Sequence, residues 1–166
     1  TTHDRIVVVV KNKETGKDEV LLMAEGLITS VFGQEEAEIL KTVKGEQLKG
    51  LEYIHPLKEE VPAQKEFNHM LILGDHVTLE DGTGCVHTAP GHGPEDYEVG
   101  MKNGITLFCP VGEDGCYTDE AGKYKGQYIK DCNDEITHDL YHNNALLYEG
   151  TIDHRVGLCW RCKTPI

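Results

Sequence analysis

Residues 82–97 constrain the fold of this chain more than any other stretch. They read Gly-Thr-Gly-Cys-Val-His-Thr-Ala-Pro-Gly-His-Gly-Pro-Glu-Asp-Tyr. The first glycines favour a turn, and residues 85–88 have the character of a short strand. Ala89-Pro90-Gly91 breaks that strand, because proline lacks an amide donor and glycine admits positive φ. Pro94 then suits the first turn of a helix. The segment predicts a strand, a loop and a helix start in immediate succession.

The same segment concentrates groups that bind and react. His87 and His92 lie close in sequence to Glu95 and Asp96, and carboxylates are favoured at a helix N-terminus. Glycine costs chain entropy and charged groups resist burial, so this combination seldom arises for packing alone. It predicts one wall of a pocket. The alternative is a tight surface turn with solvated side chains, because short motifs also occur by chance.

Hydrophobic patterning along the rest of the chain predicts many short strands and few helices. Ile-Val-Val-Val-Val at residues 6–10 has the composition of a strand, and a partner strand at 19–23 would complete a hairpin. Residues 35–43 are ambiguous between helix and strand. Further strands are predicted at 50–57, 70–78, 84–88, 105–109 and 146–153, and helices at 24–32, 95–102 and 131–142. This order predicts a mainly β fold with peripheral helices, whose antiparallel-rich sheet forms a closed or partly closed barrel.

The motif at residues 82–97 resembles the central motif of the editing domain of isoleucyl-tRNA synthetases, which are class I aminoacyl-tRNA synthetases. The C-terminal His-Arg-Val-Gly-Leu-Cys-Trp-Arg-Cys-Lys-Thr-Pro-Ile resembles the segment that leads back to the synthetic core of those enzymes. Residues 73–78, 133–134 and 145–147 also fit. Related valyl and leucyl editing domains carry Pro-Ala-His-Asp in the loop. This chain has Ala89-Pro90-Gly91-His92-Gly93, which favours the isoleucyl branch.

The resemblance implies a single editing domain over residues 1–166, with 154–166 returning toward the synthetic core, and a β-barrel with helices outside. In this family the domain hydrolyses the ester of valine mischarged onto tRNA(Ile) and excludes isoleucine; cleavage before transfer stays an open alternative. One methylene in an apolar pocket is worth only about 1–3 kcal/mol, a limit for which this synthetase is the standard example, so a second pocket is needed. The ATP-handling motifs His-Ile-Gly-His and Lys-Met-Ser-Lys-Ser do not occur in this chain, so we expect no ligase activity from it.

Most of the expected site residues come from matching the family's motif to this sequence. Asp96 is expected to bind the charged α-amino group of the substrate through a charge-assisted pair, with a helix-capping role as the alternative. His87 shares a strand face with Cys85 and is expected to contact the aminoacyl adenosine; a core histidine bonded to the backbone is the alternative. Thr88 belongs to the same substrate-binding set. His92 either shapes the pocket or is exposed.

Thr1 and Thr2 match the end of a threonine-rich stretch that lines the family's pocket and holds substrate and water. Thr2 therefore joins Asp96 and His87 in the expected catalytic set. The usual Pro-Trp-Thr-Leu-Pro continuation is missing here, so a passive chain end is the alternative. A Cys–His hydrolase that uses Cys85 is a further alternative, although a small apolar cysteine more often packs without thiolate activation. An aminoacyl ester is already labile, so a positioned water suffices.

Charge limits the partners of this piece. The net charge is −13 at pH 7, whereas affinity for phosphates comes from lysine and arginine. We expect weak tRNA binding by a monomer, with the valine-bearing 3′ end of tRNA(Ile) and the rest of the synthetase in cis as partners. A non-catalytic tRNA-docking insert is the alternative function. No apolar run suggests a membrane span or an export signal, so a cytoplasmic protein without a membrane partner is expected.

Six cysteines without an export signal do not predict a disulfide framework. Only Cys159-Trp160-Arg161-Cys162 has metal-ligand spacing, and tetrahedral zinc needs four ligands, so this pair is half a site. The resemblance implies that the other pair lies upstream in the full synthetase. We expect no cofactor in this fragment, with a zinc-binding module as the alternative.

Overall fold

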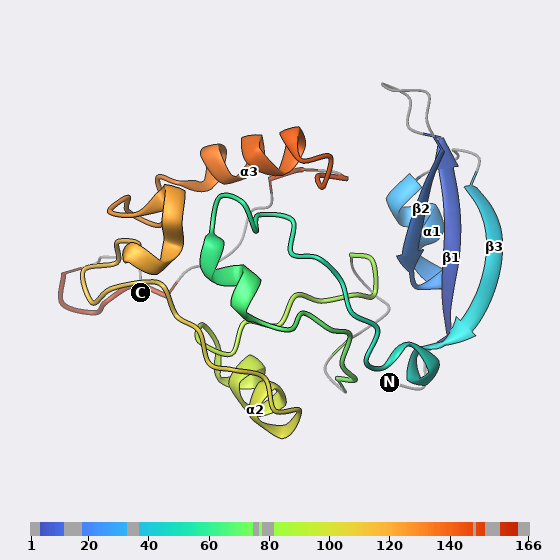
Figure 1. Ribbon diagram of the computed structural model, residues 1–166, viewed down its shortest axis with the longest axis horizontal. Coiled ribbons are helices and arrows are strands. Elements are labelled where there is room, and N and C mark those ends of the chain that lie inside the picture. Colours follow the sequence, from blue (N-terminus) through green and yellow to red (C-terminus); the bar gives the residue numbers. More distant parts are fainter. Residues whose placement is uncertain are drawn as a thin grey trace.

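One antiparallel sheet is present in the part of the chain that the computed structural model describes, residues 4–11, 18–32, 37–74, 77, 82–147, 149–151 and 157–162. Its order is β2-β1-β3, with β1 (Asp4–Lys11) between β2 (Asp18–Met23) and β3 (Ala37–Lys44) (Figure 1). Ile6 pairs with Met23, so the predicted hairpin is confirmed. The ambiguous segment 35–43 joins the sheet as β3 from residue 37 onward.

A short helix covers part of this sheet. The chain passes from β2 into η1 (Glu25–Leu27), a turn of 3₁₀ helix, and then into α1 (Ile28–Phe32). Met23, Ala24 and Leu27 are buried together, and side chains of α1 pack against them. The helix predicted at 24–32 is therefore confirmed, although its first turn is 3₁₀. The apolar positions recur at helical spacing, which gives α1 one face to bury.

A second core forms around four buried residues from separate segments: Val61, Ala121, Tyr124 and Cys132. It lies where η3 (Pro62–Glu66), η4 (Asp119–Tyr124) and α3 (Asn133–His142) meet. The helix predicted at 131–142 is confirmed, but it begins two residues later. Its N-cap is Cys132, which makes no side-chain capping bond. Because Cys132 is 0% exposed, this position serves the packing of the core.

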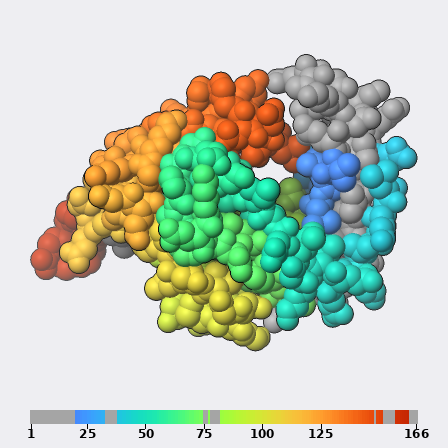
Figure 2. Space-filling view, viewed as in Figure 1, coloured from blue at the N-terminus to red at the C-terminus, as the bar shows by residue number. Residues whose placement is uncertain are grey.

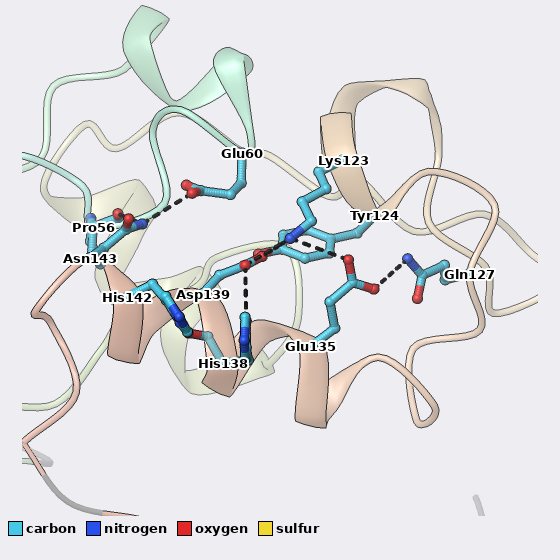
Figure 3. Close-up of polar contacts among 10 residues, drawn as sticks. All are labelled: Pro56, Glu60, Lys123, Tyr124, Gln127, Glu135, His138, Asp139, His142 and Asn143. Atoms are coloured by element: carbon cyan, nitrogen blue, oxygen red, sulfur yellow. Dashed lines mark hydrogen bonds and ion pairs between the residues drawn. The ribbon is translucent and has the colours of Figure 1, made fainter.

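An ion-pair network joins α3 to η4 (Figure 3). Asp139 is only 7% exposed, and its carboxylate accepts hydrogen bonds from Lys123 Nζ at 2.5 Å and from the Tyr124 hydroxyl at 2.7 Å. Lys123 also pairs with Glu135 at 3.3 Å. The bond from Lys123, and next the bond from Tyr124, lower the pKa of Asp139 below its ordinary value. The buried carboxylate is thus fully paired, and α3 is held against the second core.

The predicted barrel is wrong, and so is the mainly β architecture. Beyond the three-stranded sheet, residues in the described ranges pair only in isolated bridges, among them Glu52 with Met70, Val111 with Tyr117, and Cys116 with Tyr128. Residues 84–88 and 105–109 form no strand there, and the predicted strands at 70–78 and 146–153 lie partly outside those ranges. The structure is an open sheet joined to loops and short helices. Pro90 and Pro110, at the ends of two predicted strands, cannot donate to a ladder.

Figure 1 shows the sheet at one end of the molecule, α3 along the upper edge and α2 (Pro94–Lys102) along the lower edge. The segments 45–74 and 82–110 run between these parts and carry the candidate site. Of the helices in the described ranges, none combines the length and the apolar sequence that crossing a bilayer requires.

Candidate functional site

A cavity of about 590 Å³ lies beside the motif at residues 82–97. Its apolar wall includes Leu22 of β2, Leu48 of η2 (Gly45–Leu48), Leu71 and Val99. In the space-filling view the molecule is hollowed between the blue segment near residue 25 and the green segment near residue 60 (Figure 2). The polar side chains on the wall are Lys49, Tyr53, His55, Gln64, Glu66, Asn68, His69, Cys85, His87, Thr88, His92, Asn103, Thr106 and Tyr117.

A tight turn presents the motif to this cavity. The N–H of His92 donates to the carbonyl of Ala89 at 2.9 Å, so Pro90 and Gly91 are the central residues of the turn. Proline fixes φ at the first central position, which favours this geometry. The helix predicted at 95–102 is confirmed as α2, which follows the turn at once.

The other end of the motif is tied to the sheet. The carbonyl of Thr83 accepts a hydrogen bond at 2.8 Å from the N–H of Ala24, the residue that follows β2. Cys85, two residues further on, directs its thiol to the carbonyl of Leu22 at 3.9 Å. The motif is thus held at one end by β2 and at the other by α2.

Two glycines let the turn pack closely against its neighbours. A Cβ on Gly91 would overlap the carbonyl oxygen of Phe108, and a Cβ on Gly100 in α2 would overlap the ring of Pro90. Neither glycine has a positive φ. Close approach is therefore what requires glycine at position 91, and the conformational freedom expected from the sequence is not used there. These contacts fix the turn between α2 and residues 105–109.

Asp96 anchors the turn from its helical side. Its Oδ2 accepts a hydrogen bond at 2.9 Å from the N–H of Ala89. The N-cap of α2 is Gly93, which receives no side-chain capping bond, so the capping alternative for Asp96 does not describe this contact. Asp96 is half-buried and does not line the cavity, whereas Ala89 does. Its second oxygen, Oδ1, makes no hydrogen bond within the described part of the chain.

The other predicted site residues fall into two groups. His87, Thr88 and His92 all line the cavity; His87 and His92 are exposed, and Thr88 is half-buried. The structure therefore brings these three together. Thr1 and Thr2 lie outside the described residues.

Three further aromatic side chains line the cavity and were not predicted: Tyr53, His55 and His69. Burial, and then the proximity of His69 and of His87, lower the pKa of His55 from 6.5 to about 4. The imidazole of His55 is therefore neutral at pH 7. No motif spacing links residues 53–55 with residue 69, because they meet through the bridge between Glu52 and Met70. Only the count of histidines in the sequence hinted at such a cluster.

Metal ligands are not assembled in groups of three in the described ranges. No group of three or more His, Cys, Asp or Glu side chains is placed there to hold an ion. Cys159 is half-buried and Cys162 is exposed, with the exposed Trp160 between them stacked at 4.9 Å on the guanidinium of Arg161.

Comparisons with known proteins identify close relatives. No protein-family model matches the chain. It is 60% identical over 148 residues to the isoleucine–tRNA ligase of Methanothermobacter thermautotrophicus, and 53% identical over 154 residues to that of Archaeoglobus fulgidus. The isoleucine–tRNA ligase of Thermococcus kodakarensis is 48% identical over 165 residues. The alignments cover 89%, 91% and 95% of this chain but only 14%, 15% and 15% of the respective relatives.

A solved structure shares the fold. The crystal structure of GlLeuRS-CP1 superposes with a TM-score of 0.64 over 91% of this chain and 79% of that chain, at 18% identity. At that identity the likeness concerns the fold alone. About nine-tenths of this chain aligns with the isoleucine–tRNA ligase of the first relative. The chain spans only 14% of that relative's length. The chain therefore belongs to the isoleucine–tRNA ligase family as an internal domain, with a fold like that of GlLeuRS-CP1.

Proposed function

We propose that this chain is a hydrolytic editing domain that cleaves the ester of valine mischarged onto tRNA(Ile) and excludes isoleucine. The observation that carries the proposal is the cavity of about 590 Å³ to which the motif contributes His87, Thr88 and His92. Membership of the isoleucine–tRNA ligase family supplies the reason for such a site, because valine differs from isoleucine by a single methylene.

In this proposal a water molecule attacks the ester carbonyl. The ester C–O bond breaks, free valine leaves, and the ribose hydroxyl of the tRNA is restored. His87 and Thr2 act with Asp96 as the catalytic set, in which imidazole and hydroxyl donors stabilise negative charge on the carbonyl oxygen. Thr1, Thr88 and His92 complete the substrate-binding set. No covalent intermediate is required, because an aminoacyl ester is already reactive.

Asp96 acts in this scheme from the edge of the turn. Its Oδ2 holds the N–H of Ala89, which fixes the turn, and Oδ1 is the atom available for the α-ammonium of the substrate. A carboxylate and an ammonium form a charge-assisted pair that is roughly twice as strong as a neutral hydrogen bond. Isoleucine is rejected by steric overlap, since one extra methylene in a packed wall costs about 1–3 kcal/mol.

The partners follow from the same proposal. The substrate is the valine-bearing 3′ end of tRNA(Ile), and the rest of the synthetase lies in cis, since the chain aligns with 14% of the first relative. We propose a monomer that works in the cytoplasm and uses no cofactor. Cys159 and Cys162 have the spacing of half a zinc site, which would be completed only in the full-length enzyme.

Deacylation by the purified chain tests this function. We expect valyl-tRNA(Ile) to be hydrolysed well above the spontaneous rate, and isoleucyl-tRNA(Ile) to be hydrolysed at least about tenfold more slowly. His87→Ala should lose most of the valyl activity. His138→Ala, on the exposed face of α3, is the matched control and should retain it. Valyl hydrolysis at the spontaneous rate together with measurable tRNA binding would instead select a non-catalytic tRNA-docking insert.

A further inference from the structure

Two histidines in the second half of α3, His138 and His142, form a pair that the proposed function does not use. They are four residues apart, so their side chains are neighbours on one face of the helix. Their ring centroids lie 4.0 Å apart, and the ring planes are tilted by 33°. The side chain of His138 is 66% exposed, and His142 is exposed as well (Figure 3). The pair therefore faces solvent and is open to a ligand.

Both rings are oriented through the same nitrogen, Nδ1. Nδ1 of His142 lies 2.8 Å from the carbonyl oxygen of His138, which can only accept, so this Nδ1 carries a proton. Nδ1 of His138 faces Oδ1 of Asp139 at 3.6 Å, and an ionised carboxylate also only accepts. In a neutral imidazole with its proton on Nδ1, the lone pair is on Nε2. Each ring of the pair thus offers Nε2 as a free donor of electrons to a ligand.

This arrangement matches the surroundings of histidine ligands in metal sites. There the second ring nitrogen donates its proton to a carboxylate or a backbone carbonyl, which fixes the tautomer and the orientation of the ring. His138 has the carboxylate partner and His142 the carbonyl partner. Two nitrogens that each lie about 2.0–2.1 Å from one ion are at most about 4 Å apart. Rings whose centroids are 4.0 Å apart therefore need only a small rotation to share an ion.

We propose that His138 and His142 form a binding site for a divalent ion that prefers imidazole ligands, of the group Ni²⁺, Cu²⁺ and Zn²⁺. Nε2 of each ring coordinates the ion, and water molecules occupy its remaining positions. Histidines four residues apart on a helix are a recurrent way to hold such an ion. Neither residue lines the cavity, so the ion takes no part in the proposed ester hydrolysis.

Neighbouring carboxylates do not supply a third ligand. Glu135, one turn before His138, has one oxygen 3.3 Å from Lys123 and the other 2.8 Å from Gln127. Asp139 is held by Lys123 and by the hydroxyl of Tyr124. In agreement with this, no group of three candidate ligands is assembled in the described ranges. The site is therefore a two-histidine site, weaker than a structural zinc site with four protein ligands.

The position of His142 in the last turn of α3 suggests a second role for it. A cation there is favoured by the partial negative charge at the C-terminus of a helix, and a protonated histidine would meet that need without a metal. That role does not account for two rings 4.0 Å apart, because two charged imidazoles at this distance repel each other. His142→Lys separates the two roles, since lysine keeps the cation and removes the imidazole.

Titration with Zn²⁺, followed by NMR of the histidine ring signals, tests the site in the whole chain. All variants carry Cys159→Ser and Cys162→Ser, because this pair has zinc-ligand spacing of its own. His138→Ala and His142→Lys each remove one ligand. His92→Ala, which removes an exposed histidine at the cavity, is the matched control. Mg²⁺, which prefers oxygen ligands, is the control for general attraction of cations by the net charge of −13.

We expect Zn²⁺ to shift the signals of both rings together and to saturation. His138→Ala and His142→Lys should each weaken Zn²⁺ binding by about tenfold or more, since even the loss of a residue behind a ligand costs about 10–100-fold. His92→Ala should bind like the background chain. Zn²⁺ should raise the thermal midpoint only of proteins that keep both His138 and His142, because the ion binds the folded state.

Two results would overturn the inference. One is equal Zn²⁺ affinity in the background chain, His138→Ala and His142→Lys, with circular dichroism showing that all three are folded. The other is an equal response of the ring signals to Mg²⁺ and to Zn²⁺, which would indicate attraction by charge alone. Neither result bears on deacylation, which is measured without added metal.

Discussion

A single hydrogen bond, from the N–H of Ala89 to Oδ2 of Asp96, joins α2 to the turn that faces the cavity. An ionised acceptor strengthens this bond. The same carboxylate is our candidate partner for the substrate ammonium. The two roles of Asp96 can be separated, because asparagine offers an oxygen acceptor in the same place but carries no charge.

We expect Asp96→Asn to keep nearly the original urea midpoint, whereas Asp96→Ala leaves the N–H of Ala89 without its acceptor and loses about 1 kcal/mol of stability. Both variants should lose most of the hydrolysis of valyl-tRNA(Ile), because both lack the charge. Urea denaturation followed by circular dichroism, together with deacylation rates, measures the two effects. An Asp96→Asn variant that hydrolyses at the full rate would show that the charge is not used.

His55 gives the stability of the chain a pH dependence in a definite window. Its pKa is 6.5 in its ordinary state and about 4 in the folded chain, so the unfolded chain binds this proton more readily. The free energy of unfolding should therefore fall as the pH drops from about 6.5 to about 4. Above pH 6.5, the contribution of His55 to this free energy should not change with pH.

Replacing His55 with asparagine should flatten this part of the pH dependence. Urea midpoints measured between pH 7.5 and pH 4.5 compare His55→Asn with the original chain, and His142→Asn, on the exposed end of α3, serves as the control. Other groups titrate in the same range, so only the difference between variants is diagnostic. A slope shared by all three proteins would contradict the assignment.

At the scale of elements, the position of α3 depends on the bonds to Asp139. The hydroxyl of Tyr124, a residue only 2% exposed, donates to Asp139 at 2.7 Å, and Lys123 approaches from the side of solvent. We expect Tyr124→Phe to lower the free energy of unfolding by about 1 kcal/mol. Asp139→Ala should cost more, because it leaves the buried hydroxyl and the ammonium without their acceptor.

A double-mutant cycle checks whether these two residues act as a unit. The loss in the combined variant should be smaller than the sum of the single losses by about 0.5 kcal/mol or more, since the two side chains share one bond. Tyr128→Phe, an exposed tyrosine that loses the same hydroxyl, is the matched control and should change stability little. Strict additivity of Tyr124→Phe and Asp139→Ala would contradict the network.

Elements with local signals were predictable from the sequence. The helices at 24–32, 95–102 and 131–142 carry their apolar spacing and end signals within their own residues, and the paired strands β1 and β2 are close in sequence. Strands at 84–88 and 105–109 were predicted from composition alone. A strand also needs a partner that the sequence does not name, and in the described ranges these segments have none in a ladder.

At the scale of the whole molecule, two cores lie apart and the cavity lies on the segments that run between them. One core joins β2 to α1, and the other joins η3, η4 and α3. The number of predicted strands and their irregular order predicted a barrel. These features indicate which segments are strands, but they do not determine whether the sheet closes. The open three-stranded sheet shows that limit.

The candidate site was predictable only where its residues belong to the motif at 82–97. His87, Thr88 and His92 belong to a motif that is contiguous in sequence, and all three line the cavity as a group. Tyr53, His55 and His69 reach the same cavity through the pairing of Glu52 with Met70, which no local pattern encodes. The lowered pKa of His55 likewise depends on packing between segments that are distant in sequence.

A crystal structure of the chain with a non-hydrolysable valyl-adenosine mimic would test the central claim most directly. Our account predicts the valyl group in the cavity beside His87 and Thr88, with its ammonium within hydrogen-bonding distance of Oδ1 of Asp96. A mimic bound outside this cavity, or with its ammonium remote from Asp96, would contradict it.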